Sequence, residues 1–191
     1  MGSAGVFAAL ALLVSLQGWL PGERALEEAI LGWASPAVIS VFQGINYLGD
    51  KRVVLPATLL LLWVTPAGAR RRWWLWAAVM VAAPLLEGVG KEIIGRPRPV
   101  ENAFGFPSGH ATAASAFFFL AAYLLGKRLD GSGARVILLW VLAAVLVALV
   151  ALARIVLRAH WPGDTLAGAA LGLACVSLAA WWHERSGGRH G

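Results

Sequence analysis

Six apolar stretches dominate this chain and limit the folds open to it. They occur at about residues 5–20, 53–69, 73–90, 111–126, 136–157 and 165–182. Only 14% of the residues are charged, so polar side chains could not cover the surface of a soluble domain of this length. Backbone groups in hydrocarbon must form hydrogen bonds within their own segment, and the stretches lack the alternation of barrel strands. The sequence therefore predicts an all-α integral membrane bundle of six transmembrane helices, built as a single domain over residues 1–191.

The ends of these stretches carry further expectations. Some stretches are shorter than the ~20 residues that cross a bilayer core, and we expect flanking residues to extend them. No basic residue precedes the apolar run at residues 6–16, and no small-residue cleavage site follows it, so we expect a retained span rather than a signal peptide. Cys175 lies inside an apolar run, where a small packing role is expected.

Residues 22–50 break the apolar pattern between the first two spans. The interruption comes from four charged residues and a proline, Glu23, Arg24, Glu27, Glu28 and Pro36. Two short interfacial helices, over residues 25–33 and 37–47, fit this pattern better than a seventh span. A re-entrant hairpin is the alternative. Of the two roles open to this segment, a lid or packing, we favour packing.

Three short polar clusters stand where apolar stretches begin or end. They read Lys91-x6-Arg98-Pro99, Pro107-Ser108-Gly109-His110 and Arg154-x5-His160-x3-Asp164. A charge inside hydrocarbon costs at least ~2.5–3.5 kcal/mol on insertion scales, so ionisable groups at such places indicate a functional site. With six spans, the clusters close the third span, open the fourth and join the fifth to the sixth. All three therefore fall on one membrane face.

The opposite face collects basic residues that have no place in these clusters. Against only Asp130 and Glu184, they are Arg70, Arg71, Arg72, Lys127, Arg128, Arg135, Arg185 and Arg189. The positive-inside tendency then predicts cytoplasmic termini and an outward-facing site, once the basic residues of the clusters are set aside as functional. Because the basic residues flank apolar stretches, the net charge of +6 indicates membrane anchoring and no nucleic-acid partner.

The second cluster predicts a helix N-terminus that can hold an anion. Ser108 is a good N-cap residue, and Gly109 leaves the first turn open to a ligand. Free N–H groups and the positive end of the helix dipole favour a phosphate there. An ordinary helix cap would explain Ser108 alone. His110 favours the functional interpretation, because the dipole disfavours an imidazolium in the first turn.

The first cluster supplies cations. Lys91 precedes a proline-stiffened exit that carries Arg98. Two basic residues snorkelling at the interface are the simpler explanation of this cluster alone. Glu87 lies one helical turn before Lys91, which permits an ion pair with a structural role. We expect Arg96 and Arg158 to be interfacial residues without a role in the site.

The third cluster is the most specific of the three. Pro162 suits the first position of the last helix, which places Asp164 in its first turn. An acidic residue there also stabilises a helix without any function. His160 precedes it by four residues, and a carboxylate that orients one imidazole nitrogen makes the other a better nucleophile. A metal site is the competing interpretation, which the surrounding cations disfavour. We expect neither a metal nor a cofactor.

Taken in this order, the clusters resemble the signature of the type 2 phosphatidic acid phosphatase superfamily, in particular its integral-membrane lipid phosphatases. The resemblance covers residues 91–164, and the six-span outline extends it to nearly the whole chain. Ala153 stands where the family usually has serine, which puts one minor phosphate contact in doubt. The resemblance implies that His160 attacks phosphorus, that Asp164 supports it and that His110 protonates the leaving oxygen. It also implies phosphate binding by Lys91, Arg98, Ser108, Gly109 and Arg154.

The substrate implied by this resemblance is a lipid phosphate in the bilayer. An outward-facing site in a bacterial cytoplasmic membrane favours an isoprenoid diphosphate such as undecaprenyl diphosphate, with phosphatidic acid or phosphatidylglycerophosphate as alternatives. A lipid-phosphate transporter or binding protein and a lipid phosphotransferase are the competing functions. Intact His110, His160 and Asp164 argue against a transporter, because binding alone requires no nucleophile.

Overall fold

The computed structural model describes residues 2–65, 73–100, 102–129 and 133–187. Within these ranges the chain is helical, with one isolated bridge between Pro97 and Phe104 and no strand. The elements are α1 (Gly2–Gln17), α2 (Glu23–Leu31), α3 (Pro36–Asn46), the 3-10 turn η1 (Tyr47–Gly49), α4 (Lys51–Val64), α6 (Trp73–Ile94), α7 (Gly109–Arg128), α8 (Ala134–Val156) and α9 (Pro162–Gly187). The all-α prediction is confirmed.

The six-span prediction is confirmed only in part. Each apolar stretch holds a helix, but in the described ranges only α7, α8 and α9 are both long and apolar enough to cross a membrane. The pair α2–α3, bent by 114°, would make a fourth span if it counted as one. The shortness of α1 and α4, with 16 and 14 residues, explains the difference for these two helices.

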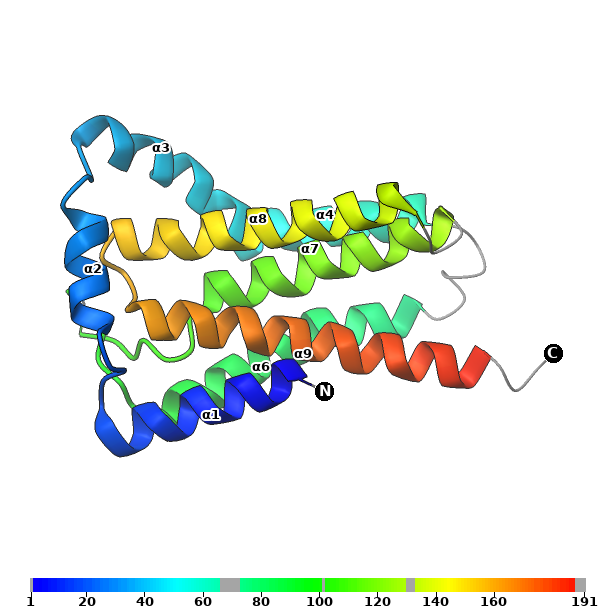
Figure 1. Cartoon of the computed structure of the whole chain (residues 1–191). Coiled ribbons are helices and arrows are strands. Elements are labelled where there is room, and N and C mark those ends of the chain that lie inside the picture. Colours follow the sequence, from blue (N-terminus) through cyan, green and yellow to red (C-terminus); the bar gives the residue numbers. More distant parts are fainter. Residues whose placement is uncertain (1, 66–72, 101, 130–132, 188–191) are drawn as a thin grey trace.

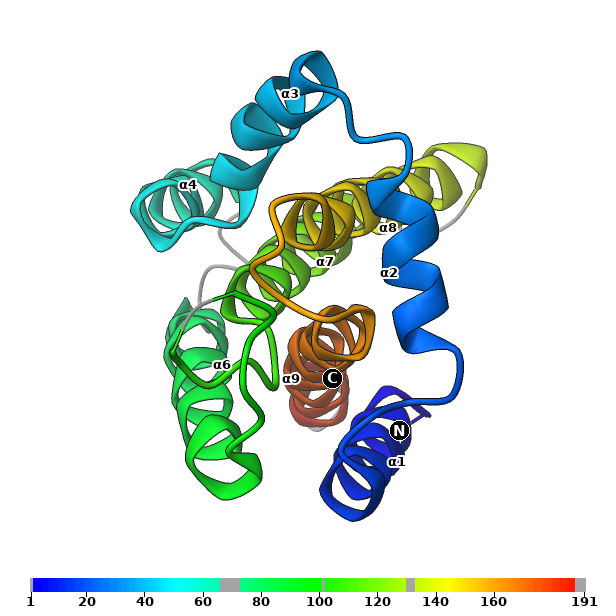
Figure 2. The same ribbon diagram turned by 90° about the vertical axis from the view of Figure 1, so that its left-hand side faces the viewer.

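Helix α7 lies at the centre of the bundle. Viewed along the helices, α6, α8 and α9 surround it, and α1 lies on the outer side of α9 (Figure 2). Glycines bring α7 and α9 close together, because a Cβ at Gly168 would lie 2.5 Å from the carbonyl oxygen of Ser108. A Cβ at Gly172 would lie equally close to the carbonyl oxygen of Thr112. This packing fixes the start of α7 against the start of α9.

The segment between α1 and α4 forms two short helices, as expected. Helix α2 lies across one end of the bundle, and α3 turns back from it beside α8 (Figure 1). Ser35 caps α3 through a bond from the Val38 N–H, and Pro36 occupies its first position. Helix α2 buries Glu23 and Glu27, which lie on the side toward the bundle. The segment therefore packs on the end of the bundle, and its role as packing rather than as a lid stays a prediction.

The same end of the bundle gathers all three polar clusters. The loop between α6 and α7 and the turn between α8 and α9 both lie at the end covered by α2 (Figure 1). At the opposite end, Lys127 Nζ pairs with Glu184 Oε1 at 2.6 Å. Four of the proposed cytoplasmic anchors, Arg70, Arg71, Arg72 and Arg189, and Asp130 lie outside the described residues. The outward orientation of the clusters stays a prediction.

Candidate active site

The turn between α8 and α9 holds the third cluster in place. The carbonyl oxygen of Arg154 accepts hydrogen bonds from the N–H groups of Ala159 and His160, and Pro162 is the first residue of α9, as predicted. The side chains of His160 and Asp164 are both buried, with exposed fractions of 1% and 0%. His160 Nδ1 lies 3.6 Å from Asp164 Oδ2, longer than the ~3 Å of an N–H···O bond. Catalytic hydrogen bonds are often this long before substrate binds.

Asp164 is fixed on both of its carboxylate oxygens. Arg96 Nη1 donates to Oδ1 at 2.7 Å, and the Trp161 N–H donates to Oδ2 at 3.1 Å. Its backbone carbonyl accepts from the Ser108 N–H at 2.9 Å, which ties the start of α9 to the start of α7. The carboxylate therefore has a defined orientation, with Oδ2 on the side of His160.

The expectation for Arg96 was wrong. Arg96 is not an interfacial residue: it is 4% exposed, and its guanidinium joins Asp164 to Glu23 of α2. Burial of a cation is tolerated here because two carboxylates neutralise it. Arg158, which we placed in the same group, is exposed, and its backbone has a positive φ of 53°.

Ser108 occupies the N-cap position of α7, as predicted, but its side chain does not cap the helix. The residue is completely buried, and within the described residues its Oγ has no hydrogen-bond partner. Gly109, the first residue of α7, lies against the carboxylate of Glu87, since a Cβ there would be 2.9 Å from Glu87 Oε1. The predicted ion pair of Glu87 with Lys91 is present.

The two arginines of the clusters, Arg98 and Arg154, form hydrogen bonds with different parts of the chain. Arg98 Nε donates to the Phe104 carbonyl at 3.2 Å, within the loop between α6 and α7. Arg154 Nη1 donates to Asn46 Oδ1 at 2.8 Å, which connects the end of α8 to the end of α3. Both arginines lie within electrostatic range of His110 and His160. The structure thus brings the first, second and third clusters to one place.

The electrostatics of His160 favour its neutral form. Burial lowers the pKa of this imidazole, and the positive charges of Arg154 and Arg98 lower it further, while Asp164 acts in the opposite direction. The result is a pKa below the ordinary value of 6.5. A neutral imidazole at neutral pH keeps the lone pair that a nucleophile needs.

Four residues near the clusters were missed by the sequence analysis as parts of this site. They are Glu23, Asn46, Asp50 and Arg96. Asp50 caps α4 by accepting from the Arg52 N–H at 2.8 Å and lies within electrostatic range of His110. The one available signal in the sequence was the four-residue spacing of Glu23 and Glu27, which places both on one face of a helix.

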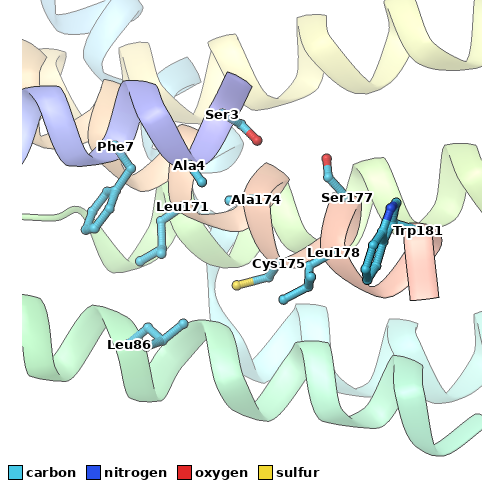
Figure 3. Close-up of a pocket in the computed structure, with 10 residues that line it drawn as sticks. All are labelled: Ser3, Ala4, Phe7, Leu86, Leu171, Ala174, Cys175, Ser177, Leu178 and Trp181. Atoms are coloured by element: carbon cyan, nitrogen blue, oxygen red, sulfur yellow. The ribbon is translucent and has the colours of Figure 1, made fainter. Parts of the chain in front are cut away.

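Two hollows differ in their relation to these residues. One, of about 560 Å³, lies between α4, α6 and α7 and reaches Gly109 and His110. The other, of about 300 Å³, lies between α1, α6 and α9 and is lined by Phe7, Leu86, Cys175 and other mainly apolar side chains (Figure 3). None of the predicted phosphate ligands lines the second hollow, so only the first belongs to the site.

The chain is similar to known proteins over most of its length. It is 30% identical over 190 residues to phosphatidylglycerophosphatase B of Bacillus subtilis (strain 168), covering 94% of this chain and 92% of that protein. It is 29% identical over 147 residues to decaprenylphosphoryl-5-phosphoribose phosphatase of Mycobacterium tuberculosis (strain ATCC 25618 / H37Rv), covering 72% of this chain and 76% of that protein.

Comparison with solved structures agrees with the sequence comparison. The crystal structure of the first transmembrane PAP2 type phosphatidylglycerolphosphate phosphatase, from Bacillus subtilis, matches with a TM-score of 0.79 at 28% identity and covers 96% of both chains. Residues 72–187, more than half of the sequence, match the model of the PAP2 superfamily. The resemblance seen in the three clusters is thereby confirmed: this integral membrane chain belongs to the PAP2 superfamily.

Proposed function

We propose that this protein is a membrane lipid phosphatase that hydrolyses a phosphate monoester or diphosphate through a phosphohistidine at His160. Its family and its named relatives identify a phosphatase. The observation that carries the finer proposal is the buried His160–Asp164 pair, which lies within range of Arg98 and Arg154 at one end of the bundle. A buried imidazole beside fixed cations is suited to attack a phosphoryl group.

In the proposed reaction, His160 Nε2 attacks phosphorus in line with the leaving oxygen, because Nδ1 faces Asp164. The N–P bond forms as the P–O bond to the lipid breaks, and His110 donates a proton to the departing oxygen. Water then attacks the phosphohistidine and gives its proton to His110. The N–P bond breaks, inorganic phosphate leaves, and both histidines return to their starting forms.

Lys91, Arg98 and Arg154, with Ser108 and the N–H groups at the start of α7, hold the phosphoryl oxygens in this proposal. Charge on these oxygens is stabilised in the transition state by donors that are already in place. The unpartnered Ser108 Oγ supports this role, because a buried hydroxyl without a partner is costly unless a ligand satisfies it. The pairing of Lys91 with Glu87 supports the same role for Lys91, since it holds the ammonium beside Gly109.

A lipid substrate is supported by the hollow of about 560 Å³ that reaches His110. Its walls include Leu55 of α4 and Met80, Val81 and Leu85 of α6. An acyl or prenyl chain lying along these side chains would bring its phosphate to Gly109 and His110. The predicted outward orientation favours undecaprenyl diphosphate. The name of the Bacillus relative favours phosphatidylglycerophosphate, and phosphatidic acid is the third candidate.

The test is phosphate release from these three lipids by the purified protein in detergent, with a chelator present. We expect the wild type to release phosphate from at least one lipid and His160→Ala to be inactive on all of them. Brief reaction of the wild type with a ³²P-labelled lipid, followed by alkaline quenching, should trap label that is acid-labile. Wild-type inactivity on every lipid would refute the phosphatase proposal, and an active His160→Ala would refute the phosphohistidine.

A further inference from the structure

The guanidinium of Arg96 joins two carboxylates from separate parts of the chain. Its Nη1 donates to Asp164 Oδ1 at 2.7 Å and to Glu23 Oε1 at 3.2 Å, and its Nη2 pairs with Glu23 Oε2. All three side chains are almost fully buried, with exposed fractions of 3% for Arg96, 1% for Glu23 and 0% for Asp164. Glu23 belongs to α2, Arg96 to the loop after α6 and Asp164 to α9.

Glu23 is itself held from several directions. Its Oε1 accepts from the Gly163 N–H at 2.6 Å, and its Oε2 accepts from the Leu20 N–H at 3.2 Å. Gly163 is suited to this approach, because a Cβ there would lie 2.7 Å from Glu23 Oε1. A carboxylate from α2 thus binds the N–H of the second residue of α9, where the helix dipole favours a negative charge.

We propose that Arg96 and Glu23 are positioning residues that hold the carboxylate of Asp164 toward His160. This inference rests on the proposed roles of His160 and Asp164. Arg96 occupies Oδ1 and thereby leaves Oδ2 to face the imidazole, while Glu23 holds Arg96 and the first turn of α9. A fork of donors on a planar guanidinium can serve two carboxylates at once, which an ammonium cannot do with the same geometry.

The charges around His160 and Asp164 predict how the loss of Arg96 changes the pH profile of activity. Asp164 faces His160 in the turn and Arg96 from the loop, and Glu23 from α2 lies behind Arg96. His160 also lies within range of Arg154, Arg98 and His110. Without Arg96, the Asp164 charge loses its cation and therefore holds a proton on His160 more strongly. This change moves the acid limb of activity to higher pH.

The test compares Arg96→Met, Arg96→Lys and Glu23→Gln with the wild type on the best lipid of the panel. For Arg96→Met we expect kcat to fall by about 10- to 100-fold, the usual effect of removing a group that orients another. We expect KM to stay close to the wild-type value and the acid limb to move to higher pH. Arg96→Lys should recover part of kcat, and Glu23→Gln should show a smaller loss in the same direction.

Arg24→Met is the matched control. Arg24 is exposed on the same helix as Glu23, and its guanidinium lies 4.1 Å from the ring centroid of Trp19, an indole that Arg96 also approaches at 5.0 Å. It touches neither carboxylate in the described contacts, so its kcat and pH profile should match the wild type. Arg96→Lys and Glu23→Gln keep a polar side chain of similar size, so their kcat and pH profiles test the inference even if Arg96→Met does not fold.

Three results would overturn the inference. The first is wild-type kcat and an unshifted acid limb in Arg96→Lys and Glu23→Gln. The second is a rise in KM without a fall in kcat, which would make Arg96 a phosphate ligand. The third is an equal loss in Arg24→Met. These results leave the phosphatase proposal intact, whereas an inactive wild type would refute that proposal first.

Discussion

The two sides of the candidate site treat their buried polar atoms differently. On the carboxylate side, both oxygens of Asp164 and both oxygens of Glu23 accept hydrogen bonds or ion pairs. On the side of the predicted phosphate, Ser108 Oγ is buried without a hydrogen-bond partner in the described part of the chain. The fold therefore gives partners to the carboxylates that orient the nucleophile, although Arg96 Nε has none among the described residues, and it leaves the Ser108 hydroxyl unsatisfied.

This difference predicts that substitutions in the two parts of the site affect stability and activity differently. Removing a partner from a buried, satisfied network leaves uncompensated charge and destabilises the fold. Removing a buried polar atom that has no partner costs the fold little and can stabilise it. Substitutions of the two carboxylates should therefore reduce both stability and activity, whereas removal of the Ser108 hydroxyl should reduce activity alone.

The largest effect is expected for Asp164→Asn. An amide cannot accept from both Arg96 and the Trp161 N–H, so the side chain loses its fixed orientation. We expect kcat to fall by about 10³- to 10⁴-fold, as for an aspartate that orients a catalytic histidine. The free energy of unfolding should fall by about 3–5 kcal/mol, the usual cost of breaking a buried ion pair. Lipid hydrolysis and thermal unfolding in detergent measure the two effects.

Glu92→Gln is the control for that variant. Glu92 is exposed in the last turn of α6, so the loss of its charge should leave both measurements unchanged. An Asp164→Asn protein with wild-type stability and strongly reduced activity would contradict the comparison, because the carboxylate would then be free of the network that the contacts indicate.

A smaller effect is expected for Ser108→Ala. The loss of one donor to the phosphoryl oxygens should lower kcat by about 10²-fold, the lower end for removal of a single donor of this kind. Stability should stay unchanged or rise slightly, because the hydroxyl has no partner in the described residues. Hydrolysis rates and melting temperatures from the same preparations check both statements.

Ser115→Ala offers the opposite pattern on the same helix. Ser115 is also completely buried, but its Oγ donates to the Ala169 carbonyl at 2.7 Å, away from the clusters. We expect this variant to lose about 1 kcal/mol of stability and to keep its activity. If the two serine variants behaved alike, the distinction between a hydrogen-bonded structural hydroxyl and an unpartnered phosphate-binding hydroxyl would be wrong.

The parts of the site that could be predicted from the sequence are those that depend on local chain direction. Pro162 begins α9 because its fixed φ suits the first helical position. Ser108 stands at the N-cap of α7, as its residue type predicts, but without the side-chain bond that explains this preference. The Glu87–Lys91 pair follows in the same way from four-residue spacing. The grouping of the clusters at one end needed only the order of the apolar stretches.

The missed contacts depend on how distant elements pack. Glu23 and Arg96 are 73 residues apart, and Asn46 and Arg154 are 108 residues apart. No periodicity connects these residues, and their pairing depends on α2 lying across the bundle and on α3 turning back beside α8 (Figure 1). The sequence could not predict that the Ser108 hydroxyl lacks a hydrogen-bond partner among the described residues, because its surroundings come from α9 as well as from its own helix.

The smallest effect is a pH dependence that both sides of the site share. His160 has a pKa below 6.5 in the folded protein, because burial and then the arginines outweigh Asp164. The unfolded imidazole therefore binds a proton at a higher pH than the folded one, so stability falls as the pH drops below 6.5. Because the neutral imidazole is the proposed nucleophile, the acid limb of kcat/KM should also lie below 6.5. In Asp164→Asn, which removes the opposing charge, the limb of the residual activity should lie lower still. An acid limb at or above 6.5 in the wild type, measured on a lipid whose own ionisation is constant in that range, would show that Asp164 outweighs burial and the cations at His160.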